Sequence, residues 1–188
     1  HGDKDFVTTG PDGKPRSLFV DEAGFVASIH GHNRCTSCHR DIVEVPHPDG
    51  FRPAPVAGSQ CPRVESGIYL ASDHGLAVHR GVAEAASCKD CHGSTHTLLN
   101  SRNAASPVNR RNLAQTCGRC HANAAEMKKF HLRQENPVGT YEHSVHGIAI
   151  MQKQAMNAAV CTDCHGSHDL HKSTNPASKL YWQKVPET

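Results

Sequence analysis

The sequence has little of the material from which an ordinary domain builds its interior. Only 5% of the residues are aromatic, and 37% are hydrophobic even with cysteine included. Leu, Ile, Val and Phe together fall below what a packed globule of 188 residues uses, so side chains alone cannot fill a normal core. No hydrophobic run approaches the roughly 18 residues that a membrane-spanning helix needs, and we predict no transmembrane segment.

The sequence also lacks a strong charge of either sign. Twenty Lys and Arg residues face 18 Asp and Glu residues, which leaves a net charge of +2 with histidine neutral. This balance does not favour nucleic acid or an anionic membrane as a partner. The chain begins at His1 without methionine, as it would after removal of a secretion signal, so we expect a periplasmic or extracellular protein.

Cysteine and histidine are abundant instead, with 9 Cys and 16 His. The pattern Cys-x-x-Cys-His occurs at Cys35–His39, Cys88–His92, Cys117–His121 and Cys161–His165, whereas random placement would give roughly 0.04 such patterns. Two thiols at this spacing can add to the two vinyl groups of one porphyrin, and the adjacent imidazole then reaches its iron. A zinc knuckle or a dithiol redox motif explains a cysteine pair, but neither needs a histidine after every second cysteine.

We therefore predict four covalent c-type haems, each with its iron. They are attached through Cys35, Cys38, Cys88, Cys91, Cys117, Cys120, Cys161 and Cys164. The remaining cysteine, Cys61, is expected to be a buried thiol. The haems supply the buried apolar surface that the side chains lack. The expected fold is mainly irregular, with short α-helices and a small N-terminal β-hairpin, and wraps around a stack of four haems.

Local patterns predict where the regular elements lie. Residues 6–20 are expected to form the hairpin, turning at Pro11-Asp12-Gly13. A short strand at Ile42–Val45 should precede an irregular, proline-rich loop from Pro46 to Pro62. Ala-rich stretches with helix propensity are Gly81–Ser87, Arg111–Gln134 and Glu142–Val160. In the last of these, Val145, Ile148, Ala149, Met156 and Val160 can share a stripe that faces a haem.

An internal repeat divides the chain into two tandem diheme units. Tyr69-x-x-Ser72-x-His74-Gly75 recurs as Tyr141-x-x-Ser144-x-His146-Gly147, and His96-x-Leu98 recurs as His168-x-Leu170. We assign an N-terminal arm at 1–24, unit one at 25–106, unit two at 107–178 and a tail at 179–188, all organised by the haems into one compact domain.

The repeat also proposes the iron ligands. The signatures supply the proximal ligands His39, His92, His121 and His165. Two histidines per unit recur as distal candidates, His74 and His96 and then His146 and His168. The glycines after His74 and His146 would let a porphyrin face approach the backbone. His30, in a third Ser-x-His-Gly, is a fifth candidate. Met127, Met151 and Met156 are less favoured, because histidine is in surplus.

These motifs resemble those of multihaem c-type cytochromes whose haems carry two histidine ligands. Among them, the sequence is similar to small tetrahaem proteins of respiratory and extracellular electron transfer, including those that polymerise into filaments, or nanowires. It departs from the pattern by one extra residue, Thr95, before His96. The resemblance implies an electron carrier rather than an enzyme, with other redox proteins or extracellular acceptors as partners. The alternative is a small reductase or oxidoreductase of nitrogen or sulfur compounds, with one haem open to substrate.

The end of the repeat suggests an assembly. A third unit at the same offset would begin just past Thr188. If His96 reaches forward to the Cys117 haem, the equivalent step carries His168 to the Cys35 haem of another copy. Such a contact generates a head-to-tail homopolymer. In the competing interpretation, His30 ligates the Cys35 haem within its own chain, which then stays monomeric.

Overall fold

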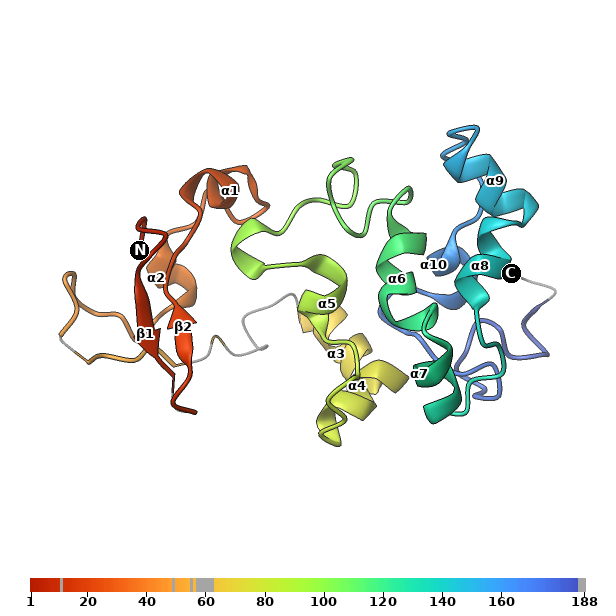
Figure 1. Ribbon diagram of the computed structural model, residues 1–188, viewed down its shortest axis with the longest axis horizontal. Coiled ribbons are helices and arrows are strands. Elements are labelled where there is room, and N and C mark those ends of the chain that lie inside the picture. The colour runs from red at the N-terminus through yellow and green to blue at the C-terminus, as the bar shows by residue number, and fades with distance from the viewer. Residues whose placement is uncertain (11, 49, 55, 57–62, 186–188) are drawn as a thin grey trace.

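The computed structural model describes residues 1–10, 12–48, 50–54, 56 and 63–185. Figure 1 shows an elongated molecule, with the N-terminal hairpin, α1 and α2 at one end and α8, α9 and α10 at the other. The predicted strand and helix types are present, since the described residues form ten short α-helices and one two-stranded antiparallel sheet. None of these helices is long and apolar enough to cross a membrane.

The elements follow one another along the chain in a simple order. They are β1 (Val7–Thr9), β2 (Pro15–Ser17), α1 (Glu22–Ala27), α2 (Cys35–Cys38), α3 (Arg63–Ala71), α4 (Asp73–His79), α5 (Cys88–His92), the 3-10 helix η2 (Thr95–Thr97), α6 (Leu113–His121), α7 (Ala124–Lys129), α8 (Pro137–Glu142), α9 (Val145–Met151) and α10 (Cys161–His165).

The expected N-terminal hairpin is present. Strands β1 and β2 pair antiparallel, with Val7 opposite Ser17 and Thr9 opposite Pro15. Gly13 adopts a positive φ of 76°, which suits glycine at the tip of the connection. Pro11, the first residue of the predicted turn, lies outside the described residues. All strand residues are exposed, so the hairpin covers no core of its own.

Two of the predicted elements are wrong. Residues 42–45 form no strand, and Val43 and Val45 are 90% and 84% exposed, because no neighbouring strand is present in the described part to pair with them. Residues 81–87 form turns rather than a helix. Gly81 has a φ of +77° and ends α4, which overrides the helix propensity of the alanines that follow. Cys61 and most of residues 54–62, the second half of the predicted proline-rich loop, lie outside the described residues.

The two longer helical predictions are too long. The stretch Arg111–Gln134 contains α6 and α7, which are separated by Asn123, whose side chain caps α7. In Glu142–Val160 only α9 is a full helix, because the chain turns at Gln154 with a φ of 54°. The five residues expected to share one stripe do not lie on one helix, since Met156 and Val160 follow the end of α9 at Met151.

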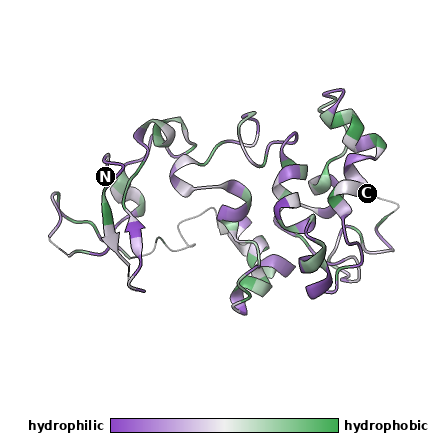
Figure 2. Cartoon of the chain, in the orientation of Figure 1, coloured by the Kyte–Doolittle hydropathy of each residue, from purple (hydrophilic) through white to green (hydrophobic). Residues whose placement is uncertain are grey.

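The hydrophobic core is as small as the composition led us to expect. Leu113, Ile150 and Val160 form one buried cluster, with Val108 and Ala158 against it. Figure 2 shows hydrophobic residues spread along the whole ribbon rather than gathered in one layer. Among the described residues, the largest side chains that are completely buried are small and polar, namely Ser72, Ser106 and Ser178. Because so little apolar surface is buried, protein packing alone contributes little to holding the elements in place.

Equivalent hydrogen bonds explain the repeated motifs. The Tyr69 hydroxyl donates to the Ala86 carbonyl at 2.8 Å, and the Tyr141 hydroxyl donates to the Ala159 carbonyl at 3.0 Å. Tyr69 therefore ties α3 and α4, the helix pair with His74, to the start of α5. Tyr141 likewise ties α8 and α9, the pair with His146, to the start of α10. The Ser106 hydroxyl donates to the Leu99 carbonyl, and the Ser178 hydroxyl likewise donates to the His171 carbonyl.

Candidate metal centres

The Ser-x-His-Gly motif is a helix start. Ser72 and Ser144 are the N-caps of α4 and α9, and their hydroxyls accept from the Gly75 and Gly147 amides, both at 3.1 Å. The histidine therefore lies in the first turn of its helix. At the third copy, Ser28 accepts instead from the His30 amide at 3.1 Å. The serine thus fixes the backbone immediately around each histidine.

The glycines of this motif have a structural role that the sequence interpretation did not consider. A Cβ on Gly75 would lie 2.0 Å from the Tyr69 carbonyl oxygen, and one on Gly147 would lie 2.1 Å from the Tyr141 carbonyl oxygen. A Cβ on Gly31 would lie 2.1 Å from the Val26 carbonyl oxygen. Glycine is therefore required because the backbone folds tightly back on the preceding helix, whether or not a porphyrin lies near.

Three pairs of the predicted histidines face each other. The ring centroids of His39 and His96 are 6.1 Å apart, with the ring planes at 39°. Those of His74 and His121 are 6.1 Å apart at 44°. Those of His92 and His168 are 5.9 Å apart at 16°. Each pair joins one signature histidine to one histidine from outside the signatures.

This spacing fits two imidazoles on opposite sides of one iron. Each bonded nitrogen lies about 2 Å from the metal and the ring centroid about 1.1 Å further, so two opposite centroids are about 6.2 Å apart. Rings stacked in direct contact would be about 3.5–4 Å apart face to face. The three centroid spacings are therefore compatible with two imidazoles that share one iron.

The protonation states suit this role. The pKa values of His74, His92, His96, His121 and His165 all lie below the ordinary value, in each case first because of desolvation by the surrounding protein. The facing histidine lowers the pKa further for His74, His92 and His96. A neutral imidazole is the form that binds a metal, so these side chains are held ready to ligate.

The signature helices follow one another in space. The Cys117 and Cys161 thiols share a hydrogen bond, which raises the pKa of Cys117 and lowers that of Cys161 to about 7. Cys91 and Cys120 are close enough for the thiol of one to raise the pKa of the other. His96 lies four residues beyond the second signature and faces His39 of the first, so the first two signatures are neighbours as well. The four signatures therefore form a row in sequence order.

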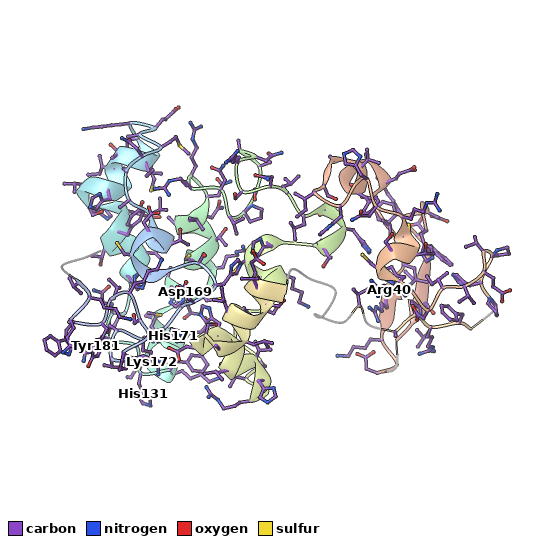
Figure 3. All side chains as sticks on the ribbon, turned by 180° about the vertical axis from the view of Figure 1, so that it is seen from behind. Arg40, His131, Asp169, His171, Lys172 and Tyr181 are labelled. Atoms are coloured by element: carbon purple, nitrogen blue, oxygen red, sulfur yellow. The ribbon has the colours of Figure 1, made fainter. Side chains whose placement is uncertain are left out.

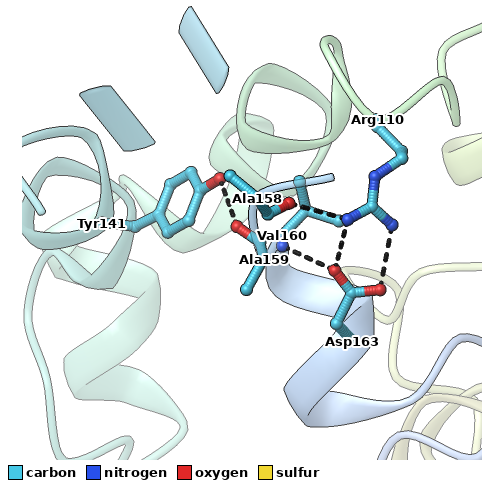
Figure 4. A network of polar contacts seen from close by, with 6 residues as sticks. All are labelled: Arg110, Tyr141, Ala158, Ala159, Val160 and Asp163. Atoms are coloured by element: carbon cyan, nitrogen blue, oxygen red, sulfur yellow. Dashed lines mark hydrogen bonds and ion pairs between the residues drawn. The ribbon is translucent and has the colours of Figure 1, made fainter. Parts of the chain in front are cut away.

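An ion-pair network holds the last signature helix. Arg110 donates from Nη1 and Nη2 to the two carboxylate oxygens of Asp163, at 2.9 and 2.6 Å, and from Nη2 to the Ala158 carbonyl at 2.7 Å (Figure 4). The Val160 amide donates to the same carboxylate at 2.8 Å, and these bonds, led by Arg110, lower the pKa of Asp163. Ser87 and Asp90 make the equivalent amide-to-carboxylate bond in the second signature, at 2.7 Å.

The sequence interpretation did not identify these supporting residues. Asp90 and Asp163 occupy the same place in two signatures, Cys-x-Asp-Cys. This shared position could have indicated that both aspartates support their signature helix. Arg110 has no counterpart in unit one, so nothing in the repeat pointed to it.

The pairing of the histidines also differs from the predicted scheme. His96 faces His39 rather than reaching forward to the Cys117 site, and His168 faces His92 within the same chain. It is His74 that faces His121, the histidine of the Cys117 signature. His165 has no ring partner within the described residues, and neither do His30 and His146. His146 is exposed and His30 is half-buried.

No group of three or more His, Cys, Asp or Glu side chains that could hold a bare metal ion occurs among the described residues. The eight signature cysteines are free thiols rather than disulfides. Comparisons with protein-family models, with curated proteins and with solved structures find no match to this chain.

Proposed function

We propose that this protein transfers electrons along a row of four covalently bound c-type haems. The observation that carries the proposal is the set of three facing histidine pairs, each joining a Cys-x-x-Cys-His histidine to a distant one at 5.9–6.1 Å. A haem supplies reversible one-electron chemistry at its iron when it is bound. An iron with two imidazole ligands has no open position for substrate, which favours a carrier over an enzyme.

The chain's own residues set the arrangement. Neighbouring signature helices lie close enough for their thiols to interact, as Cys117 and Cys161 do, so adjacent haems would be near neighbours. Tyr69 and Tyr141 fix the distal-histidine helices against the chain before Cys88 and Cys161. Two histidines and no methionine at an iron favour low reduction potentials. Redox proteins or extracellular acceptors are the partners that this role implies, in a periplasmic or extracellular setting.

The first experiment tests the cofactor. The intact mass of the purified protein should exceed that of the polypeptide by four haems, and the colour should stay with the protein after acidic acetone extraction. Loss of the colour into the solvent, or metal analysis that finds zinc in place of iron, would contradict the proposal. Replacing Cys91 and Cys88 together by alanine should remove one haem mass and leave three.

The unpaired His165 supports a second candidate function. A haem held there by His165 alone would have an open face, as in a reductase of small nitrogen or sulfur compounds. His165 is itself exposed, which speaks against a closed substrate pocket around it. Binding of carbon monoxide or nitrite to one haem per chain in the fully assembled protein would favour this candidate.

A further inference from the structure

The second and fourth signatures carry a carboxylate at the same position but differ in the charge beside it. Asp90 directly precedes Cys91, and Asp163 directly precedes Cys164, so each aspartate lies between the two cysteines of its signature. Attachment of a haem through those cysteines would hold each carboxylate close to the edge of the porphyrin. The charge that accompanies each aspartate therefore bears on the iron at that site.

At the fourth signature, an arginine balances the carboxylate. Arg110 donates to both oxygens of Asp163, at 2.9 and 2.6 Å, so the two planar groups form a bidentate ion pair (Figure 4). A further bond of 2.7 Å, from Nη2 to the Ala158 carbonyl, fixes the guanidinium against the chain that leads into α10. The pair carries no net charge, whereas Asp163 alone would carry one negative charge.

At the second signature, neutral groups bind the carboxylate instead. The Ser87 amide and hydroxyl donate to one carboxylate oxygen of Asp90, at 2.7 and 2.5 Å. These bonds are the main cause of the lowered pKa of Asp90, and the cations Lys89 and Arg119 contribute least to it. Asp90 therefore keeps its negative charge at neutral pH. The two units share the aspartate and differ in what balances it.

Arg110 is the cation that decides the charge at the fourth signature. It makes the largest contribution to the lowered pKa of Asp163, and Lys179 makes the smallest. Beyond α10, the charged residues Asp169 and Lys172 lie on a segment that runs beside α3 and α4 (Figure 3). Removing Arg110 would therefore leave Asp163 without a bonded counter-charge.

We infer that Arg110 raises the reduction potential of the Cys161 haem by cancelling the charge of Asp163. The inference rests on the proposed function, since it requires a haem at that site. A negative charge near an iron stabilises its ferric state and so disfavours the arrival of an electron. Arg110 removes this penalty at the last site of the row, whereas Asp90 retains it at the Cys88 haem. Arg110 acts through Asp163 and is a positioning residue.

The size of the effect is limited by the exposure of the pair. The side chains of Arg110 and Asp163 are 35% and 39% exposed, so water screens their charges in part. A unit charge about 10 Å from a metal, at an effective dielectric constant of about 20 to 80, changes the ratio of reduced to oxidised metal by about 2- to 17-fold. We expect a change within this range when the ion pair is broken.

The test is a cycle of charge variants made as holoprotein. Arg110→Ala, Asp163→Asn, the double variant and Arg110→Lys are each prepared with four haems verified by mass. Nuclear magnetic resonance of the haem methyl groups follows the four haems separately through a redox titration. A protein with Cys161→Ala and Cys164→Ala lacks the fourth haem, so the signals missing from its spectrum identify that haem in the other proteins.

Each variant has a defined expected result at a fixed ambient potential. Arg110→Ala leaves Asp163 unbalanced and should lower the reduced-to-oxidised ratio of the Cys161 haem by about 2- to 17-fold. Asp163→Asn leaves the arginine unbalanced and should raise the ratio. The double variant and Arg110→Lys restore a neutral pair and should return to the wild-type ratio. Arg111→Ala is the matched control, because it removes the same charge from an exposed side chain that bonds elsewhere, and it should leave the ratio unchanged.

Loss of packing and loss of charge give different results in this cycle. An equal fall in Arg110→Ala and in the double variant would indicate packing and would overturn the inference. A wild-type ratio in both single variants, or an equal fall in Arg111→Ala, would overturn it as well. If Arg110→Ala does not take up four haems, the other variants decide, since Asp163→Asn must raise the ratio and Arg110→Lys must preserve it. Four covalent haems by mass leave the proposed function standing in all these cases.

Discussion

Replacing Gly75 by alanine should open one haem without touching any ligand. The new Cβ would lie 2.0 Å from the Tyr69 carbonyl oxygen and 2.8 Å from the Leu70 Cα, whereas real Cβ atoms essentially never approach within 3.0 Å. Helix α4 must therefore move by about 1 Å relative to the end of α3, at a cost of about 1–3 kcal/mol for an overpacked site.

This shift acts directly on His74, which precedes Gly75 in the first turn of α4. A movement of about 1 Å is half the length of a metal–imidazole bond of about 2 Å, so the bond cannot be kept. His121 would remain as the only protein ligand of the Cys117 haem. We expect about one quarter of the haem to become high-spin and to bind carbon monoxide. Electron paramagnetic resonance and carbon monoxide titration measure both.

Two other glycines provide matched controls. Gly147→Ala creates the same clash, 2.1 Å from the Tyr141 carbonyl, but His146 faces no signature histidine, so the spin state should stay that of wild type. At Gly67 in α3, a Cβ meets nothing within 4 Å, and alanine should stabilise the helix by about 0.5–1 kcal/mol. A Gly75→Ala protein with a wild-type spectrum and melting temperature would refute the reasoning. So would an equal spin change in Gly147→Ala.

Three further outcomes are expected. His168→Ala should turn about one quarter of the haem high-spin, because His92 would lose its facing imidazole, and electron paramagnetic resonance measures this change; a wild-type spectrum would contradict the pairing of His168 with His92. Tyr69→Phe and Tyr141→Phe should each cost about 0.5–1.5 kcal/mol in chemical unfolding, one hydrogen bond apiece, and clearly unequal losses would contradict their equivalence. Arg110→Ala should cost no more than about 1 kcal/mol at pH 7, because the ion pair is partly exposed. Because Arg110 lowers the folded pKa of Asp163 below 3.8, its contribution is present above pH 3.8 and is lost as the pH falls through the folded pKa. A difference between wild type and Arg110→Ala that persists in strong acid would contradict this origin.

Local chemistry made some of the structure predictable. The hairpin follows from a Pro-Asp-Gly turn between β-prone runs, and the short helices follow from the sparse apolar content. Helix limits were predicted less well, because Gly81 and Gln154 adopt positive φ values that alanine-rich composition does not reveal. The strand at Ile42–Val45 failed because strand formation needs a partner that local sequence cannot supply.

The candidate site was likewise predicted only in part from the sequence. The repeat pointed to His74, His96, His146 and His168 as distal ligands. The first two and His168 face a signature histidine, whereas His146 faces none among the described residues. The repeat could not say which signature each one faces, because equal spacing along the chain does not fix which segments meet in space. The extra Thr95 shows the difference: it falls in η2, and His96 in that 3-10 turn still faces His39.

The pairing of distant histidines sets the order in which the sites can be completed as the chain is made. As the chain emerges from its N-terminus, the Cys35 site can gain both imidazoles once residue 96 is out, and the Cys117 site once residue 121 is out, since His74 has already emerged. The Cys88 site must wait for His168. The second signature to appear is thus completed third. If a haem is attached there during that interval, as the proposed function requires, His92 would be its only histidine ligand and its second face would be open.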